Sequence, residues 1–472
     1  IAAHIGSAVI IDYSSSVGRI AVEGDDTSTN GVLEFRSRRS NGTNSNTAMI
    51  LDGNSRISLS NNDSGTGNTI FGKSTATSLD AGSNYNVLIG GSIATGSMND
   101  ATHNVAVGSD ALQDITSGDN NVAIGSSALL NITSGERNVV IGRQAGQAMT
   151  SANRTIAIGY QALYSEDADG DRTVAIGHQT LYSQNGNDEV MGNTAVGYIS
   201  GFYNVTGRYN TYMGYGSGGA GAGGTASHSN NTGIGYKALE GITTGGSNVA
   251  IGRDAMISAT TAAENVAIGY EALGDVDAGS GANVAIGFYA MRNVDEGTGG
   301  GDADYNIAIG YDALKGGDFA SNDRALQGNI AIGMQAMNST DDNAQTGTIA
   351  IGHQSLKFLT SGAGNTALGY LSGEYNQTGS QNTYVGYASG LGASGNSHST
   401  NTAVGYFTLK DVTTGGANTV IGCFAGDAVT SQDSLTLVGK NAGGAISHNN
   451  ANGSVAVGAS ALAGCVSGEK NV

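Results

Sequence analysis

A short pattern of apolar and small residues recurs along most of the chain. In its fullest form it reads Asn-Val-Ala-Ile-Gly, with alanine and leucine three and four positions after the glycine, as in residues 121–129. Side chains two positions apart in a strand share a face, so valine and isoleucine point to one face and the alanine between them to the other. Each unit therefore predicts two short strand-like pieces separated by a glycine.

The unit occurs 22 times, and its glycines are most often 17 residues apart. One unit offers about three or four aliphatic side chains, too few for a core of its own, so neighbouring units must stack. The sequence thus predicts an all-β protein, a parallel β-roll or β-solenoid of about 22 coils. At about 4.8 Å per coil, the stack would be a rod of roughly 100 Å. The repeat glycines stand at positions 72, 90, 108, 125, 142, 159, 177, 197, 214, 235, 252, 269, 287, 310, 333, 352, 369, 386, 405, 422, 439 and 458.

An asparagine stands four residues before the glycine in most units. Stacking in register places these amides above one another, and such ladders stabilise stacked strands because each amide hydrogen-bonds the next. The recurrent glycine indicates a tight turn with positive φ or a close approach between coils. The absence of proline fits a fold in which every N–H is needed as a donor. The predicted structural ladder contains Asn104, Asn121, Asn138, Asn248, Asn265 and Asn283.

The sequence also contains a long duplication and a boundary between two kinds of segment. Residues 193–252 return as residues 365–422 at an offset of 172 residues, and a Ser-His-Ser loop returns with them. A stack of coils tolerates such a duplication, whereas a closed globular fold does not. Residues 1–62 lack the repeat and predict a separate β-rich segment, while residues 63–472 predict the shaft. The chain stops on Asn471-Val472, where another repeat would open, so we expect both ends to be cut.

Composition narrows the class of protein. Of 472 residues, 77 are glycine and 12% are charged, and the glycines lack the three-residue period of collagen. The net charge of −19, from 39 acidic and 20 basic residues, disfavours a nucleic acid as partner because phosphate binding needs clustered lysine and arginine. No apolar run of about 18 residues is present, so the sequence predicts no membrane-spanning helix.

Two resemblances follow from these patterns. The repeat Asn-x-Ala-Ile-Gly-x-x-Ala, over residues 64–472, resembles the head repeats of trimeric autotransporter adhesins, although the spacing is longer here. That resemblance implies a left-handed roll and a homotrimer. Residues 31–37 and 48–54 are similar to a Gly-x-Leu-x-Phe … Met-x-Ile-x-x-x-Gly-Asn pattern of bacteriophage tail-fibre proteins, particularly those of marine phages.

Together the resemblances imply a structural fibre or filament protein, the shaft of a trimeric viral tail fibre that serves as a rigid spacer and binds a host surface. The expected partners are other copies of the chain, other fibre or virion proteins, and a host glycan or protein receptor. The expected location is the virion, outside the cell. The alternative is the head of a trimeric adhesin on a bacterial outer surface.

An enzyme is the third hypothesis. A polysaccharide-cleaving tailspike needs two carboxylates about 5 to 10 Å apart in a groove. The acidic residues concentrate in the polar inserts between repeats, and no recurring pair falls on the strands. We therefore expect no enzymatic activity and no cofactor.

A tyrosine often follows the repeat glycine, so stacked coils should align these rings in a stripe. Tyrosine packs through its ring and offers a hydroxyl, which suits recognition of a sugar or a protein. The alternative is that the stripe lines the subunit interface of a trimer, since a thin roll needs a partner to cover its apolar flank. The stripe contains Tyr160, Tyr198, Tyr215, Tyr236, Tyr270, Tyr311, Tyr370, Tyr387 and Tyr406.

Three further motifs resemble ligand-binding sequences. Residues 67–74 match a phosphate-loop pattern and residues 216–221 match GxGxxG, but neither is followed by the helix that such a loop needs. Asp167, Asp169 and Asp171 have the alternating spacing of a calcium loop. Calcium is a candidate there, and a solvated acidic insert is the alternative.

Overall fold

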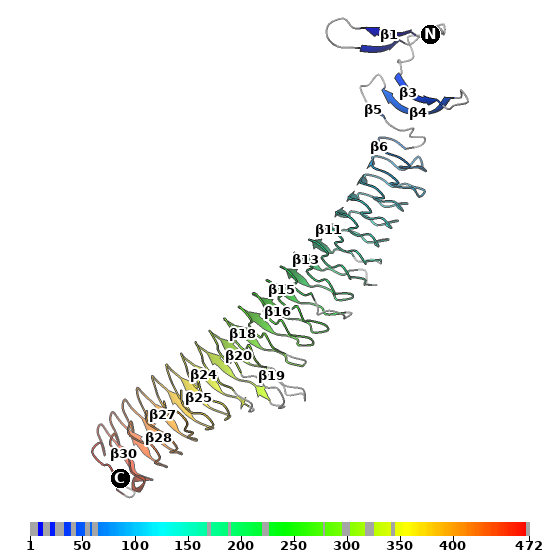
Figure 1. Ribbon diagram of the computed structural model, residues 1–472. Helices are drawn as coiled ribbons and strands as arrows, with labels where there is room; N and C mark the ends of the chain where they lie inside the picture. Colours follow the sequence, from blue (N-terminus) through cyan, green and yellow to red (C-terminus); the bar gives the residue numbers. More distant parts are fainter. Residues whose placement is uncertain are drawn as a thin grey trace. The chain divides into compact units, whose positions relative to one another are not determined.

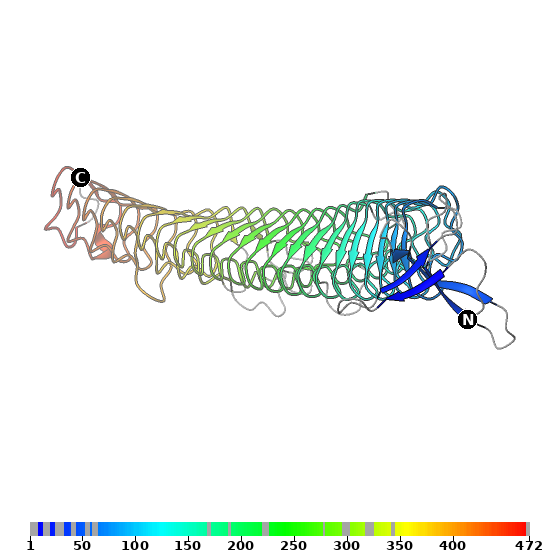
Figure 2. The ribbon, with the colours of Figure 1, turned by 90° about the horizontal axis from the view of Figure 1, so that it is seen from above.

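The structure is a computed structural model of the chain (Figures 1 and 2). It describes the backbone of five N-terminal strands and then residues 65–468, apart from residues 168–170, 187–189, 220–225, 277–278, 295–302, 317–324 and 341–344. The chain divides into two compact units, Ile1–Gly192 and Asn193–Val472. Within the described residues, regular structure is β apart from one 3-10 turn, η1 (Asn449–Ala451). No helix in this part of the chain is long and apolar enough to cross a membrane.

The first five strands pair antiparallel. They form a two-stranded and a three-stranded sheet, which precede the first parallel strand at Thr69. Antiparallel pairing therefore gives way to parallel pairing near the predicted boundary at residues 62 and 63. The strands are β1 (Ala8–Asp12), β2 (Arg19–Glu23), β3 (Leu33–Arg38), β4 (Asn44–Leu51) and β5 (Ile57–Ser58).

The rest of the first unit is a stack of turns, each contributing one three-residue strand. Every strand pairs parallel and in register with the strand of the next turn. The seven strands are β6 (Thr69–Phe71), β7 (Val87–Ile89), β8 (Val105–Val107), β9 (Val122–Ile124), β10 (Val139–Ile141), β11 (Ile156–Ile158) and β12 (Val174–Ile176).

The second unit is built in the same way, and Figure 1 shows its strands as a ladder of short arrows. The main ladder comprises β13 (Thr194–Val196), β14 (Thr211–Met213), β15 (Thr232–Ile234), β16 (Val249–Ile251), β17 (Val266–Ile268), β18 (Val284–Ile286), β20 (Ile307–Ile309), β22 (Ile330–Ile332), β24 (Ile349–Ile351), β25 (Thr366–Leu368), β26 (Thr383–Val385), β27 (Thr402–Val404), β28 (Thr419–Ile421), β29 (Thr436–Val438) and β30 (Val455–Val457). Three two-residue strands form a second parallel sheet, β19 (Ala303–Asp304), β21 (Leu326–Gln327) and β23 (Gln345–Thr346). The prediction of a parallel β-solenoid is confirmed, with about 20 turns.

Most turns contain one strand rather than the two pieces predicted, and the additional strands β19, β21 and β23 lie before the repeat glycine and not after it. After Gly125, for example, the chain makes consecutive turns, with Ser127 and Leu129 at φ of +57° and +49°. A residue in the left-handed region breaks the extended path, so the backbone curls around the core instead of running on as a strand. The prediction of a second strand-like piece was wrong for this reason.

The middle residue of each three-residue strand faces the core, and it is most often alanine. In β16, Ala250 is buried whereas Val249 and Ile251 are only half-buried, and Ala250 pairs in register with Ala267 of the next turn. In most turns leucine or methionine stands four positions after the repeat glycine and fills the remaining interior, as Leu239 does. The first and third residues of each strand, usually valine, isoleucine or threonine, are therefore directed outward.

The repeat glycine meets both conditions that the sequence suggested. Gly125 has φ of +136°, and a Cβ on it would lie 2.5 Å from the carbonyl oxygen of Gly142 in the next turn. Since real Cβ atoms do not approach a backbone atom so closely, a side chain here would push the turns apart. The glycine column thus sets the spacing between turns on this side of the solenoid.

Candidate functional site

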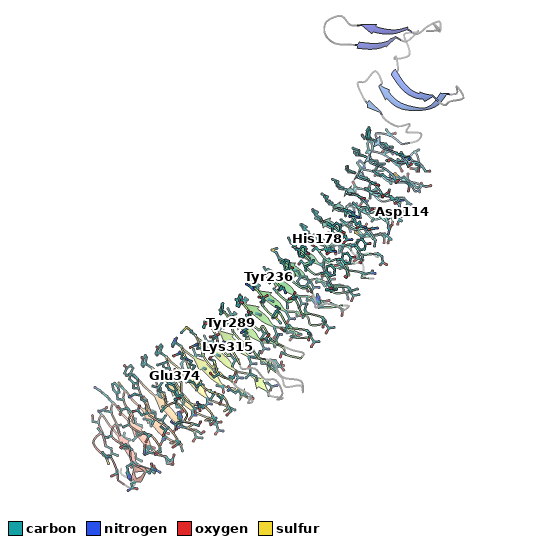
Figure 3. The ribbon with its side chains drawn as sticks, viewed as in Figure 1. Asp114, His178, Tyr236, Tyr289, Lys315 and Glu374 are labelled. Atoms are coloured by element: carbon teal, nitrogen blue, oxygen red, sulfur yellow. The ribbon has the colours of Figure 1, made fainter. Side chains whose placement is uncertain are left out.

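The outer surface of the second unit carries a continuous column of large side chains. We call it the tyrosine column, and it consists of the residues that directly follow the repeat glycines from Tyr198 to Tyr406; Tyr236 is labelled in Figure 3. Tyr215 stacks on Tyr198 and on Tyr236, with centroid distances of 5.1 and 5.2 Å. The column comprises Tyr198, Tyr215, Tyr236, Arg253, Tyr270, Phe288, Tyr311, Met334, His353, Tyr370, Tyr387 and Tyr406.

The residues that replace tyrosine preserve most of the stacking. The Arg253 guanidinium lies 5.4 Å from the Tyr236 ring and 5.5 Å from the Tyr270 ring, an arrangement favoured by the negative face of each ring. His353 stacks on Tyr370 at 4.8 Å. The column therefore consists of stacked runs of side chains on either side of Met334.

Stacking decides which part of each ring is available to a partner. The planes of Tyr370 and Tyr387 are 12° apart and their centroids 5.0 Å apart, so each ring face is occupied by its neighbour along the column. The ring edges and hydroxyls remain outside. A sugar that packs on an aromatic ring needs an open face, whereas a protein surface can bind edges and hydroxyls. The geometry favours a protein partner for this column.

Two further columns of outward-pointing side chains lie beside the tyrosine column, one aliphatic and the other with threonine at eight of its 15 positions in the second unit. They consist of the residues three and one positions before each repeat glycine, such as Val249 and Ile251, which point away from the core. We call these two columns and the tyrosine column the outer face. In the second unit the outer face holds 42 residues, 15 in each of the two strand columns and 12 in the tyrosine column, of which Arg253 alone carries a full charge. Several of its members are well exposed, among them Met213, Leu368 and Ile421.

The first unit has a different version of the outer face. Its two strand columns are apolar apart from Thr69, but the residues after its repeat glycines include Ser109 and Ser126. The aromatic part is limited to Tyr160 and His178, which stack at 5.0 Å, with the Arg143 guanidinium 5.9 Å from the Tyr160 ring. Tyr160, predicted as part of the stripe, therefore stacks on a histidine in the first unit.

All six predicted ladder asparagines are buried. The Asn104 side chain donates to Asn86 Oδ1 at 3.1 Å and to the Gly118 carbonyl at 2.8 Å. Its own Oδ1 accepts from the backbone N–H and the side chain of Asn121, at 2.9 and 3.1 Å. The same pattern joins Asn121 to Asn138. It also joins Asn248 to Asn265, and Asn265 to Asn283. Each amide thus ties its turn to both neighbouring turns.

The predicted calcium residues are not gathered into a site in the described part of the chain. Asp169 lies outside the described residues. Asp171 Oδ1 accepts from the backbone N–H of Asn153 at 2.6 Å and from its side chain at 3.1 Å, so this carboxylate joins two turns. Asp167 accepts through its backbone carbonyl, from Thr150 Oγ1 at 2.6 Å. No group of three potential metal ligands occurs among the described residues.

The first glycine-rich motif lacks the local structure of a nucleotide-binding loop. In residues 67–74, the four positions between the glycines contain β6, and the chain after Gly72 continues into turns, with Ser74 at φ of +56°. A phosphate would have no helix N-terminus to bind there. Residues 220 and 221 of the second motif lie outside the described part of the chain.

Two buried tyrosine–histidine pairs were not predicted from the sequence. Tyr212 replaces the inward alanine of β14, and its hydroxyl lies 2.7 Å from Nδ1 of His228. Tyr384 and His398 form the same pair in the duplicated segment, at 2.5 Å. Burial lowers the pKa of both imidazoles to about 4, and it raises the pKa of both phenols well above 10.

Glycines make room for these rings. Turns with alanine in the strand mostly carry leucine or methionine four positions after the repeat glycine, whereas the Tyr212 turn carries Gly218 there. A Cβ on Gly218 would lie 2.5 Å from the Tyr212 ring. The exchange of small and large residues between two positions of one turn was the sequence signal that could have placed Tyr212 and Tyr384 inside.

Comparison with known proteins adds no relative. No protein-family model, no curated protein and no solved structure matches the chain.

Proposed function

We propose that this chain is a structural fibre protein, the shaft of a homotrimeric viral tail fibre that holds a binding surface at a distance. The observation that carries the proposal is the outer face, which is nearly free of charge and carries exposed aromatic and aliphatic side chains along the second unit. Exposed apolar patches of this extent on soluble proteins mark surfaces that bind a partner. The depletion of charge matches the core of protein–protein interfaces.

The size of the face fits stable association. In the second unit 15 turns at about 4.8 Å, with three columns across about 13 Å, present roughly 900 Å². A standard interface buries about 800 Å² on each partner. Every copy of the chain carries the same face, so closed symmetry of a few copies would cover it in all of them. The stacked tyrosines are then interface residues, their hydroxyls bonding across the contact.

The mechanism of such a shaft is mechanical. Parallel ladders, glycine contacts and asparagine hydrogen bonds join each turn to the next, and no step in that series depends on a ligand. The polar inserts between repeats are the variable parts, suited to contact with a host surface because loops carry specificity on a rigid scaffold. Several weak contacts made by one virion would add up through multivalency. The shaft would act outside the cell, joined to other virion proteins.

The test is the mass of the full chain in solution, by light scattering after size-exclusion chromatography. We expect a mass close to three times 47.1 kDa. A double variant, Tyr370→Arg with Tyr387→Arg, should lower the mass toward one chain because it places positive charge in the contact. The matched control is Lys410→Glu, off the outer face, which should leave the mass unchanged. A stable, soluble wild-type monomer would contradict the proposal.

A further inference from the structure

The first unit carries a row of exposed side chains that is not part of its outer face. These residues occupy the same place in six successive turns, two positions before the first residue of each strand from β7 to β12. Each has a positive φ, between +56° and +61°. The row comprises Tyr85, His103, Asn120, Arg137, Arg154 and Arg172, and all six are exposed.

Three arginines follow one another at one end of this row. Arg137, Arg154 and Arg172 are 17 and 18 residues apart in the sequence, so they form no basic cluster there. The backbone N–H of each arginine donates to a carbonyl of the preceding turn at 3.0 or 3.1 Å. Their backbones are therefore held at the spacing of paired strands, about 4.8 Å. The solenoid assembles a basic cluster that the linear sequence does not contain.

We propose that these three residues, the arginine row, form a binding site for a linear anionic polysaccharide, whose carboxylate or sulfate groups pair with the guanidinium groups of successive turns. The site is separate from the outer face, so it requires no association between copies of the chain. It goes beyond the proposed shaft because it names a ligand and the residues that bind it.

The guanidinium groups of the arginine row are available to such a ligand. In the part of the chain that the structure describes, the side chains of Arg154 and Arg172 make no ion pair or hydrogen bond. Arg137 pairs with Glu136 at 3.3 Å, and their side chains are 56% and 40% exposed. A pair so exposed contributes little. Like charges at neighbouring in-register positions repel each other, and an anion bound by both guanidinium groups would offset that repulsion.

The backbone conformation is a second argument for a ligand. A positive φ is unfavourable for a side chain such as arginine, whereas glycine adopts it without strain. Glycine stands at the same place in three turns of the second unit, as Gly328, Gly347 and Gly364, with φ from +64° to +70°. The fold therefore does not require arginine at this place, and binding of an anion accounts for three of them in succession.

Carboxylates beside the row decide which kind of anion fits. The residues directly before row members include Asp119, Glu136 and Asp171, all half-buried. Asp119 Oδ1 accepts from the Thr102 hydroxyl at 2.9 Å, so its side chain joins two turns, as that of Asp171 does. Carboxylates accept hydrogen bonds from sugar hydroxyls, whereas they repel the phosphate that a nucleic acid carries on every nucleotide. The combination favours an acidic polysaccharide over a nucleic acid.

The test is binding of the full chain to dextran sulfate, measured by isothermal titration calorimetry at low and high salt, with uncharged dextran as the matched control. We expect binding to dextran sulfate and to alginate, a polyuronate, and none to dextran. Salt should weaken the binding because the charges are exposed. Single-stranded oligothymidylate tests the nucleic acid. Absence of binding to both anionic polysaccharides, or binding of oligothymidylate as tight as that of either, would overturn the proposal.

Variants separate a defined site from general attraction between opposite charges. Arg154→Gln should weaken the binding of dextran sulfate by about fivefold. Combined with Arg137→Gln and Arg172→Gln, it should abolish measurable binding. Arg143→Gln is the matched control, because it removes the same charge in the same unit but lies outside the row, against the Tyr160 ring. It should leave the affinity unchanged, and equal losses in Arg143→Gln and Arg154→Gln would contradict the site.

The mass of the chain keeps this proposal distinct from the proposed trimer. Every variant should show the wild-type mass in light scattering, because the exchanged side chains lie outside the outer face of the second unit. A monomeric wild type that binds dextran sulfate through the arginine row would contradict the trimer and support the site. A trimer whose affinity for dextran sulfate is unchanged by the triple substitution would contradict the site alone.

Discussion

Tyr212 and Tyr215 lie three residues apart in one turn and have opposite surroundings. Tyr212 is 0% exposed and bonds a buried histidine, whereas Tyr215 is 45% exposed and stacks between two other tyrosines. The residue type is the same, so its position in the turn makes the difference. Tyr212 occupies the inward position of β14, and Tyr215 follows the repeat glycine, where side chains point outward.

The comparison separates two kinds of constraint. The side chains inside each turn are constrained by packing, because the stacked turns leave no space into which a neighbouring side chain could move. The tyrosine column on the outside is constrained by its ring neighbours and by whatever covers it. Substitutions in the interior should therefore change the stability of the single chain, while substitutions in the column should change its association.

The largest effect is expected where the interior admits no side chain at all. Gly125→Ala should lower the free energy of unfolding by about 4 to 6 kcal/mol, because it combines backbone strain at positive φ with a clash against the next turn. Gly91→Ala is the matched control, since the nearest atom to its new Cβ is 3.8 Å away. Urea unfolding followed by circular dichroism measures both. Equal losses in the two variants would show that the close approach at Gly125 is not limiting.

The next effect tests whether the interior responds to volume. Tyr384→Ala installs the usual strand residue but should cost about 3 to 5 kcal/mol, because Gly373 and Gly390 leave a cavity where the ring was. Adding Gly390→Leu restores the common alanine–leucine combination and should recover about half of the loss. The same urea experiment applies. If the double variant were less stable than the single one, the idea that a large residue at one position is balanced by a small residue at the other would be refuted.

A smaller loss is expected in the asparagine ladder. Asn248→Ala should cost about 2 to 3 kcal/mol, since it leaves the Asn265 amide and the Ala262 carbonyl without their partners. Asn248→Thr should cost less, because threonine occupies the same column at Thr155 and Thr348. Comparing the urea midpoints of the two variants with the wild type measures this. A neutral Asn248→Ala variant would mean that the ladder contributes nothing to stability.

The smallest effect on the single chain is expected at the tyrosine column. Tyr387→Ser should change its free energy of unfolding by less than about 1 kcal/mol, because the side chain is largely outside the core. It should nevertheless weaken association, seen as a lower mass by light scattering on dilution. A loss of stability comparable to that of Tyr384→Ala, measured under conditions where the chain is monomeric, would erase the distinction between the two regions.

Part of the candidate site was accessible from the sequence. The column of rings after the repeat glycines follows from the period alone, because stacking in register aligns equal positions. The tyrosine–histidine pairs were missed because both tyrosines lie in an otherwise ordinary repeat, and only the accompanying glycines indicate that the ring turns inward. The spacing of Asp167, Asp169 and Asp171 did not reveal that the Asp171 carboxylate accepts hydrogen bonds from Asn153 in the preceding turn.

The sequence by itself determined the stacking, the parallel register and the asparagine and glycine columns. A unit of about 17 residues with so few aliphatic side chains has no other way to bury them, and equal units align equal residues. It did not determine which face of the strand is inside. The alternation of residues shows only that alanine and the branched residues lie on opposite faces of the strand. Leucine and other side chains from the rest of the turn fill the interior, so alanine fits beside them and the valines and isoleucines face outward, an outcome that depends on the closed cross-section of the turn.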